Sequence, residues 1–553
     1  MKKVRDERVD HKEEPSGIRI ITEEKQQKTR GSVETLEPPG KVEDHIASTS
    51  PDHRFTLSPS KALIAMVMLV GMAIAVFSYL ISRKPKEAAA SPSVRSIAVL
   101  PFKGLENDGS DEYLGLGIAD TLITKLSNVR QIVVRPTSAV RKYNTDEQDP
   151  VAIGREQGVD AVLQGSIRRA DEQIRVTVQL VRVSDGRPLW AGKFDEKFTE
   201  IFTVEDLISE RVAEALALNL TGAEKKQLAK RYTENTEAYQ LYLKGSYFRR
   251  KYTKEGFEKS IQYFEQALNK DPAYAPAYAG LAQTYNRLGV TGLWPANEAC
   301  QKQEWAALKA LEIDDTLAEA HVTLGGAKLS NWDWSAAERE FRRGIELDPN
   351  SVDAHHDYSY FLSAMERHDE ALREVKRAQE LEPNSAQKLG SVAKILLSAR
   401  QYDQAIEQYL KAIEMDSNFA PFHANLGVAY LAKGMSKEAL AELQKARALE
   451  DAPERRGRFA LLAYAYAITG KKAEAVKMLN ELKELSKERY ISPYNFAIIY
   501  VGLGEKDRAL DWLEKAYQEK SEALVYLKVS ETFDSLRSDS RFRDLLRRMN
   551  LAP

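Results

Sequence analysis

The chain has 553 residues, more than a single hydrophobic core usually supports, so several domains or a repeat array are expected. Its 80 basic and 82 acidic side chains give a formal net charge of −2, so no strong overall field attracts the chain to nucleic acid. The only cysteine is Cys300, so no internal disulfide can form, and we interpret Cys300 as a half-buried helix residue.

Residues 1–60 alternate in charge sign, contain several prolines and have no apolar periodicity. Such a segment buries too little apolar surface to offset the entropy lost on ordering. We therefore predict a disordered cytoplasmic tail over 1–60.

An uncharged run of 21 residues follows, beginning at Ala62 and ending at Ser82. A helix that crosses a bilayer needs about 20 apolar residues. The run starts too far into the chain for a standard signal peptide. We predict one transmembrane helix over 61–83 and a polar linker over 84–94. Basic residues flank both ends, and their local count slightly favours a cytoplasmic C-terminal side.

The residue pattern over 95–222 alternates between strands and helices. SIAVLPF, over 96–102, is typical of a buried strand, and residues 111–128 carry apolar side chains at helical spacing. Residues 160–167 and 173–183 alternate as paired strands do, and 205–220 form an amphipathic helix pattern. We predict a compact α/β domain over 95–222.

Glycines after the first strand of this domain resemble those of a phosphate-binding loop, at Gly104, Gly109, Gly115 and Gly117. They lack both the GK[ST] ending and the GxGxxG spacing that hold a phosphate against backbone amides. The pattern therefore favours a structural role for these glycines over a phosphate-binding site.

From about residue 236 onward, helix ends recur at a fixed distance along the chain. The acidic residue that closes each helix recurs every 34 residues, at Asp314, Asp348, Glu382, Asp416 and Glu450. This period is the signature of the tetratricopeptide repeat, a helix–turn–helix unit that shares its apolar face with the next copy. We predict about eight units over 236–520 and capping helices over 521–553.

Three histidines hold the same position in the first helix of their repeats, at His321, His355 and His423. Equivalent positions on stacked helices lie about 8–10 Å apart, whereas metal–nitrogen bonds are about 2 Å long. No HExxH or CxxC spacing occurs. The pattern favours packing, and we expect no metal, no cofactor and no catalytic residues.

The stretches SIAVLPF, YLGLGIADTLITKL, VDAVLQGSI and QLVRVSDGRPLWAGKFD resemble the TolB amino-terminal-like domain. In bacterial proteins this domain often follows a single membrane span and precedes tetratricopeptide repeats. NWDWSAAEREFRRGIELDPN, over 331–350, resembles the tryptophan-rich repeat of that family, and FDSLRSDSRFRDLLRRMNL, over 533–551, resembles its closing helix. The resemblance covers about 62–551 and is specific for architecture but not for activity.

Many relatives of this architecture carry a winged helix-turn-helix domain before the span, as CadC-like regulators do, or a Ser/Thr kinase domain. Residues 1–60 show neither pattern. In the winged-helix relatives the repeats lie across the membrane from the output domain. The resemblance therefore implies a single-pass protein of the bacterial inner membrane, with its C-terminal domains in the periplasm.

Stacked first helices of tetratricopeptide repeats form a concave surface that accepts an extended peptide or a helix. By analogy with other arrays, we expect the groove to be lined by Gln283, Asn286, Arg287, His356, Tyr360 and Lys394. For any one of these residues, ordinary solvated surface is an equally good interpretation.

The sequence as a whole predicts several domains: a disordered tail, one transmembrane helix, a small α/β domain and an all-α repeat solenoid. We expect a membrane-anchored scaffold that binds a protein or peptide in the repeat groove, in signalling or envelope assembly, without direct contact to nucleic acid. One alternative is a CadC-like regulator of transcription that acts through a separate output subunit. A less favoured alternative is a nucleotide-binding enzyme that uses the α/β domain.

Overall fold

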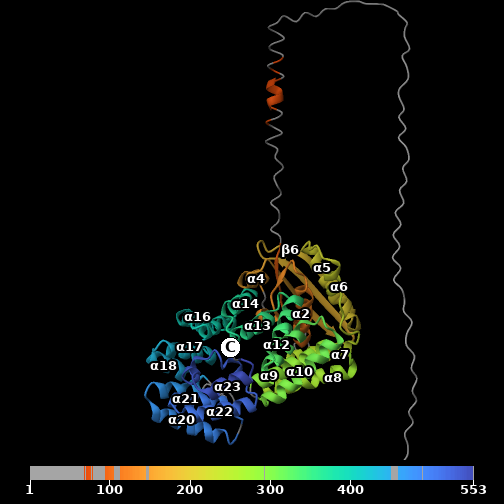
Figure 1. Cartoon of the computed structure of the whole chain (residues 1–553). Coiled ribbons are helices and arrows are strands. Elements are labelled where there is room, and N and C mark those ends of the chain that lie inside the picture. Colours follow the sequence, from red (N-terminus) through yellow and green to blue (C-terminus); the bar gives the residue numbers. More distant parts are fainter. Residues whose placement is uncertain are drawn as a thin grey trace, which may run out of the picture. The chain divides into compact units, whose positions relative to one another are not determined.

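The computed structural model describes residues 66, 68, 70–75, 78, 94–104, 112–144, 149–291, 293–449, 459–488 and 490–551 (Figure 1). The chain separates into two compact units, Met1–Ala88 and Ala89–Pro553. In the first unit the described residues are helical, and their longest continuous stretch is 70–75. The second unit holds a small α/β region followed by a long helical array.

The predicted transmembrane helix is overturned. Throughout the described parts of the chain, no helix combines the length and the apolar character needed to cross a membrane. The single-pass inner-membrane location, and the periplasmic placement derived from it, are withdrawn with the span. The remaining residues between Ala62 and Ser82, and the tail predicted over 1–60, lie outside the described residues.

The fold is therefore a mostly helical repeat solenoid with a small α/β region. That region contains a six-stranded sheet of order β3-β1-β4-β5-β6, in which β2 pairs with β4 beside this path. The strands are β1 (Ser96–Val99), β2 (Lys103–Gly104), β3 (Val133–Val134), β4 (Ala161–Ala170), β5 (Gln173–Arg182) and β6 (Pro188–Lys197). β1 runs parallel to β3 and β4, whereas β4, β5 and β6 form an antiparallel meander.

Residue periodicity explains why β5 covers the core with one face only. Its buried side chains, Ile174, Val176, Val178 and Leu180, alternate with side chains that are less buried or exposed. The helices of this region are α2 (Glu112–Ser127), α3 (Thr137–Val140), α4 (Pro150–Gln157), α5 (Ile201–Ala215) and α6 (Gly222–Leu228). α2 and α5 pack against each other and against the sheet.

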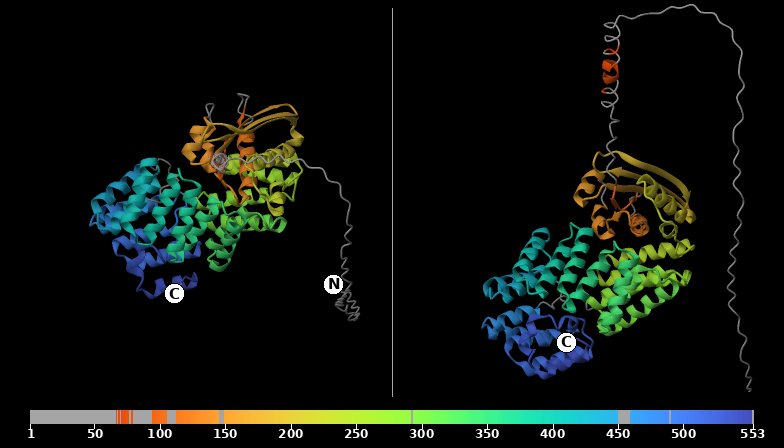
Figure 2. Two further views of the ribbon diagram at one scale, coloured as in Figure 1. Left: turned by 90° about the horizontal axis from the view of Figure 1, so that it is seen from above. Right: turned by 45° about the horizontal axis from the view of Figure 1, so that its top comes forward.

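The array consists, within the described residues, of eight antiparallel helix pairs. We call the first helix of each pair its A helix and the second its B helix. The pairs are α7 (Thr236–Arg249) with α8 (Lys254–Lys270), α9 (Ala275–Val290) with α10 (Ala296–Ile313), α11 (Ala318–Ser330) with α12 (Trp334–Leu347), α13 (Val352–Ala364) with α14 (His368–Leu381), α15 (Ala386–Ser398) with α16 (Tyr402–Met415), α17 (Ala420–Ala432) with α18 (Ser436–Ala448), α19 (Phe459–Ile468) with α20 (Lys472–Leu485), and α21 (Pro493–Leu503) with α22 (Lys506–Gln518). Both views in Figure 2 show the pairs following one another in sequence order, from green through teal to blue.

Consecutive A helices pack directly against each other, from α7 and α9 through to α19 and α21. Consecutive B helices contact each other less, so the array curves with its A helices on the inner side. We call the side lined by the A helices the concave surface.

Small residues allow the helices to approach closely. Ala405, Ala439 and Ala509 are fully buried near the start of B helices. At Gly427, in α17, a side-chain Cβ would lie only 2.6 Å from Cγ of Leu443 in α18. The spacing of small residues in the sequence thus reflects helix contact within each pair.

A left-handed residue follows the A helix in many pairs and starts the turn to the B helix. In later pairs this residue is a glycine, with φ of 75°, 86° and 83° at Gly434, Gly470 and Gly504. In the third, fourth and fifth pairs the place is held by Trp332, Glu366 and Arg400, with φ of 62°, 60° and 61°.

The C-terminus covers the end of the array. It consists of η4 (Glu522–Tyr526), η5 (Glu531–Leu536) and α23 (Ser540–Arg548). Phe533, Leu536 and Phe542 are fully buried and join the same core as α21 and α22. They shield the apolar face that the last pair would otherwise expose.

Candidate functional site: the concave surface

The six residues expected to line the groove all lie on A helices. Gln283, Asn286 and Arg287 belong to α9, His356 and Tyr360 to α13, and Lys394 to α15. All six side chains are partly exposed. Their neighbours divide them into a hydrogen-bonded group on α9 and a second group further along the array.

Gln283 belongs to a chain of polar contacts that crosses three A helices. The guanidinium of Arg249, in α7, donates a hydrogen bond to Oε1 of Gln283. Nε2 of Gln283 in turn donates to Oε2 of Glu319, in α11, at 3.3 Å. Burial raises the pKa of Glu319 to about 7, although the nearby Arg249 opposes this shift. This carboxyl group can therefore change its charge near neutral pH.

Asn286 lines a small cavity. Its Nδ2 donates to Oε1 of Gln303 at 3.3 Å, and Nε2 of Gln303 donates to the carbonyl of Thr323 at 2.8 Å. The cavity has a volume of about 20 Å³, enough for roughly one water molecule, and is also lined by Cys300, Asn331, Lys520 and Glu522. Burial raises the pKa of the Cys300 thiol to about 11, so this thiol stays protonated and unreactive.

Arg287 is a cation without a direct anionic partner. Among the described residues its guanidinium forms no hydrogen bond and no ion pair, and it lies 5.8 Å from the ring centroid of Tyr252. Burial opposes its charge, but Tyr252, Asp353 and other acidic groups nearby raise the pKa of Arg287. Arg287 therefore stays charged.

His356 and Tyr360 share one hydroxyl group on the next A helix. Nε2 of His356 lies 3.1 Å from Oγ of Ser391, and the Tyr360 hydroxyl lies 3.4 Å from the same atom. The centroids of the two rings are 4.7 Å apart. The pair forms a fixed aromatic platform between α13 and α15.

Lys394 is the second cation without a direct partner. Its ammonium group has no hydrogen bond or ion pair in the described part of the chain. Burial lowers the pKa of Lys394, and the charge of Glu531 acts against this shift. Arg287 and Lys394 thus place two basic side chains without direct polar partners among the described residues on two different A helices.

Three further residues beside the concave surface were missed by sequence reasoning: Glu522, Tyr526 and Glu531. All lie in η4 or η5, after the last repeat. The ring of Tyr526 meets that of Tyr360 edge-on, with centroids 6.2 Å apart. No periodicity marks these residues, because they follow the repeats and approach the surface only through the folding back of the C-terminus.

The equivalent histidines are structural. Nδ1 of His321, His355 and His423 lies 2.7, 2.6 and 2.6 Å from a glutamate on the B helix of the same pair. Nε2 of each lies 2.9, 3.1 and 3.0 Å from a carbonyl oxygen in the preceding turn. Over the described residues, no three His, Cys, Asp or Glu side chains are grouped so that they would hold a metal ion.

Two of the glycines compared with a phosphate loop serve helix packing. A Cβ at Gly115 would lie 1.9 Å from the carbonyl oxygen of Phe102, and one at Gly117 would lie 2.7 Å from Cδ2 of Leu243. Gly117 therefore lets α2 approach α7, the first helix of the array. Gly109 lies outside the described residues.

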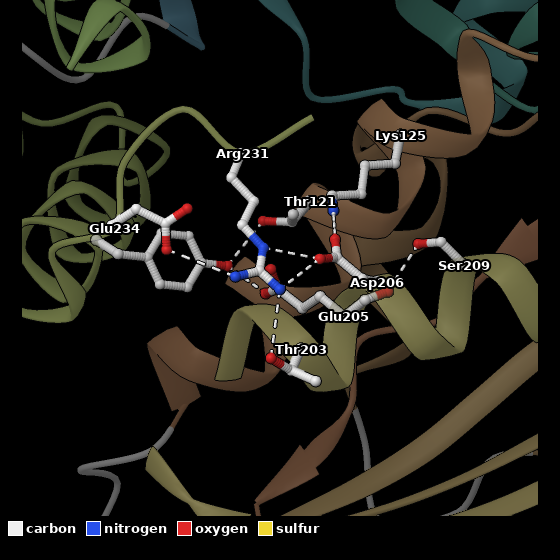
Figure 3. Close-up of polar contacts among 9 residues, drawn as sticks. Thr121, Lys125, Thr203, Glu205, Asp206, Ser209, Arg231 and Glu234 are labelled. Carbon is white, nitrogen blue, oxygen red and sulfur yellow. Dashed lines mark hydrogen bonds and ion pairs between the residues drawn. The ribbon is translucent and has the colours of Figure 1, made fainter. Parts of the chain in front are cut away.

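A polar junction surrounds this contact between the α/β region and the array (Figure 3). We define it as Thr121, Lys125, Glu205, Asp206, Arg231 and Tyr239. Asp206 binds both Lys125 and Arg231, and Nε of Arg231 lies 2.8 Å from Oδ2 of Asp206. The Tyr239 hydroxyl donates to Glu205 and lies 2.9 Å from Oγ1 of Thr121.

Glu205 is the buried acid of this junction. It is 1% exposed, and burial raises its pKa to about 7, although the hydrogen bond from Tyr239 opposes the shift. The junction thus joins α2, α5 and α7 through a carboxyl group that titrates near neutral pH.

Comparison with known proteins identifies related stretches. Residues 93–211 match the family described as HilA/YgeH-like transcriptional regulator, second domain, and residues 393–434 match the TPR repeat family. The resemblance of the α/β region to the TolB amino-terminal-like domain stays a prediction.

Two curated relatives have different names. "Putative adenylate cyclase 3" of Rhizobium meliloti (strain 1021) is 31% identical over 206 residues, which cover 36% of this chain and 35% of that protein. "Transcriptional regulator HilA" of Salmonella typhimurium is 21% identical over 301 residues, which cover 51% of this chain and 50% of that protein. The chain thus spans between a third and a half of the length of these relatives.

Solved structures of repeat proteins align with parts of the array. Pseudomonas aeruginosa pilF aligns at 18% identity with a TM-score of 0.30, covering 38% of this chain and 93% of that one. YrrB, titled a TPR protein with an unusual peptide-binding site, aligns at 24% identity with a TM-score of 0.26, covering 35% and 95%. The chain therefore contains tetratricopeptide repeats, preceded by a region similar to the second domain of HilA/YgeH-like regulators.

Proposed function

We propose that this chain is a protein-interaction module whose concave surface binds an extended peptide segment of a partner protein. The observation that carries the proposal is that the basic side chains of Arg287 and Lys394, on two different A helices, form no hydrogen bond or ion pair among the described residues. Partly buried cations without direct partners are costly to keep, and a carboxylate of a bound peptide would relieve that cost.

The neighbouring groups suit a peptide rather than a small metabolite. Polar side chains on α9 and an aromatic platform on α13 are spread over several helices, whereas the small cavity lined by Asn286 holds about one water molecule. An extended peptide crosses successive A helices and places one side chain against each. His356 and Tyr360 would pack against such a side chain between the two cations.

The proposal is tested by selecting binders for the purified full chain from a random peptide library displayed on phage. We expect the selected peptides to be enriched in Asp and Glu and to lose at least tenfold in affinity for the R287E/K394E variant, measured by fluorescence anisotropy. K433E is the control, because Lys433 pairs with Asp403 and lies outside the six groove residues. Peptides that bind both variants equally would place the binding site elsewhere and refute the proposal.

A second candidate function is that the module serves a regulator of transcription and acts through a separate output subunit or domain. The match of 93–211 to the HilA/YgeH-like second domain favours this candidate. Relatives named as a regulator and as a putative cyclase both carry stretches similar to this chain, which suits an interaction module that is used with more than one output.

This second candidate predicts a change in gene expression. RNA sequencing of a strain that lacks the chain should reveal a defined set of altered transcripts. A strain with the R287E/K394E variant should alter the same set, because the module would no longer bind its partner. Unchanged transcripts in both strains would exclude this candidate while leaving the peptide-binding proposal intact.

A further inference from the structure

The C-terminal part of the chain folds back onto the middle of the array. We define residues 517–537 as the closing segment. Tyr517 stacks on Trp332 with ring centroids 4.9 Å apart, Nζ of Lys528 lies 2.8 Å from Oε2 of Glu366, and Oδ1 of Asp534 lies 2.9 Å from Nη2 of Arg400. The closing segment therefore contacts the turns of the third, fourth and fifth helix pairs in order.

The three turn residues in these contacts have a positive φ, as Tyr252 also does in the turn of the first pair. Trp332, Glu366 and Arg400 have φ of 62°, 60° and 61°, a conformation that costs free energy for residues other than glycine. Glycine holds the same place at Gly434 and Gly470, where no closing-segment contact exists among the described residues. The turns of the third to fifth pairs thus carry side chains where glycine would suffice, and each side chain contacts the closing segment.

The inner side of the closing segment meets the concave surface. Tyr526 packs edge-on against Tyr360. Glu522 lines the same small cavity as Asn286, and its charge acts on Arg287. Glu531 is the acidic group whose charge acts on Lys394. Tyr526 therefore contacts one expected groove residue, and the charges of Glu522 and Glu531 act on two others.

We propose that residues 522–531 act as an internal ligand of the concave surface, and that the external partner presents the same chemistry. That chemistry is a carboxylate, a tyrosine four residues later and a second carboxylate five residues after the tyrosine, as in Glu522, Tyr526 and Glu531. The inference rests on the proposed function, because it names the peptide class that the same surface accepts.

An internal ligand lowers the apparent affinity for an external one. The external peptide binds only the fraction of molecules in which residues 522–531 have released their contacts with the concave surface, so its apparent Kd rises by the inverse of that fraction. The acidic groups of the segment do not form direct ion pairs with Arg287 or Lys394 in the described structure, so an external carboxylate that reaches contact distance would compete effectively.

Hydrogen exchange of the full chain, followed by mass spectrometry, reads the internal contact directly. We expect K394E to speed amide exchange of the closing segment at least tenfold, because the new carboxylate repels Glu531. The charge-swapped K394E/E531K variant should restore slow exchange. K433E, with the same charge change at a site that pairs with Asp403, should leave the closing segment unaffected.

The substitution E531Q provides a second test that alters η5 and not an A helix. Glu531 is only half-buried, so the change should be tolerated. It should speed exchange of the closing segment less than K394E does, because it removes an attraction without adding a repulsion. Unchanged exchange in both K394E and E531Q would overturn the internal contact. Failure of K394E/E531K to restore slow exchange would also overturn it.

Binding in trans tests the partner chemistry. A synthetic fluorescein-labelled peptide of residues 520–537 should bind the E366G/R400G variant at least tenfold more tightly than the unaltered chain. Glycine suits both turns, so these substitutions remove the contacts of Lys528 and Asp534 without disturbing the backbone. Equal binding to both chains would overturn the inference.

The outcomes separate this inference from the proposed function. In one outcome, library peptides depend on Arg287 and Lys394, but amide exchange of the closing segment is unchanged by K394E. That outcome would refute the internal ligand alone. In the other outcome, K394E speeds amide exchange of the closing segment, but the library yields no binder. That outcome would refute the proposed function and leave only an intramolecular contact.

Discussion

His423 illustrates how a repeated residue acquires a structural role. Its ring joins Glu442 on the B helix to the carbonyl of Ser417 in the preceding turn, and it is 1% exposed. In the fifth pair the equivalent positions hold Leu389 and Gln408, so histidine and glutamate are replaced together. The recurring histidine is therefore one half of a brace within a pair.

This view predicts a coupled effect on stability. H423L should lower stability by about 2 kcal/mol, because it leaves a carbonyl oxygen and a carboxylate without their partner. H423L/E442Q should cost less than the sum of the two single substitutions by about 1 kcal/mol, since it reproduces the natural pair of the fifth repeat. Urea unfolding of the four proteins measures this difference, and strictly additive effects would contradict the brace.

Glu205 predicts a pH dependence that originates at the polar junction. Its pKa is raised by burial from an ordinary 4.5 to about 7. Between pH 4.5 and 7 the folded chain therefore binds more protons than the unfolded chain. The contribution of Glu205 to stability is thus present below pH 4.5 and is lost as the pH rises to 7. The total loss is about 3 kcal/mol, from about 1.4 kcal/mol for each pH unit.

The variant E205Q removes this titration. The stability of E205Q relative to the unaltered chain should increase as the pH rises from 5 to 8. Urea unfolding at several pH values measures this difference. E214Q lies on the same helix, α5, at an exposed carboxylate and is the control. A difference between E205Q and the unaltered chain that does not vary with pH would show that Glu205 is ionised throughout.

At the scale of elements, the left-handed residue after each A helix sets how the two helices of a pair are connected. Gly434 has φ of 75°, and a Cβ there would meet no atom within 4 Å. Any cost of a substitution therefore comes from the backbone alone. G434A should lower stability by about 1 kcal/mol, and G434N by less, because Asn tolerates this conformation better.

The control for G434A is G222A. Gly222 also has open space around its Cβ position, but it begins helix α6 without a positive φ. Thermal unfolding should therefore show a lower midpoint for G434A and an unchanged midpoint for G222A. Equal effects of the two substitutions would mean that the backbone of Gly434 does not limit the turn.

Elements with a regular residue pattern were predictable from the sequence, and segments without one were not. The 34-residue period predicted the helix pairs because each pair buries the same small residues, such as Ala405 and Ala439. The alternation in β5 likewise marks a sheet with one buried face. The closing segment has no such period, and its contacts with the middle of the array join residues 134 to 189 positions apart, as between Arg400 and Asp534 or Asn331 and Lys520. Hydropathy alone predicted a membrane span that the described helices do not contain.

For the whole molecule, the α/β region and the array form one structural unit. One hydrophobic core runs from the sheet through Ile97 and Leu122 to Phe264 and Tyr285 of the first two helix pairs. The region also contacts the array further along the chain: Nδ2 of Asn384 donates to the carbonyl of Glu156 at 2.5 Å. The α/β region therefore bridges repeats that are distant in sequence.

Arg135 is the central residue of the second contact. Its Nε and Nη2 donate to the carbonyls of Gln157 and Gly158 at 2.9 and 3.2 Å, at the end of α4. Its Nη1 donates to the carbonyls of Glu380 and Leu381 at 2.8 and 3.1 Å, near the end of α14. The guanidinium thus satisfies the unpaired C-terminal carbonyls of two helices at once, and its charge complements both helix dipoles.

We expect R135M to disconnect the two helix ends while leaving the remaining fold in place. Four carbonyl groups lose a charged donor, so amide exchange over 155–159 and 378–384 should speed at least tenfold, which corresponds to about 1.4 kcal/mol of local stability. R135K should recover only part of the protection, because one ammonium group cannot reproduce the planar fork that reaches both helices. The matched control is R130M, at an exposed arginine of the same region. If exchange rose at only one of the two helix ends, Arg135 would serve that helix alone, and the bridge would depend on Asn384 and the apolar contact of Val133 with Val352 and Leu381.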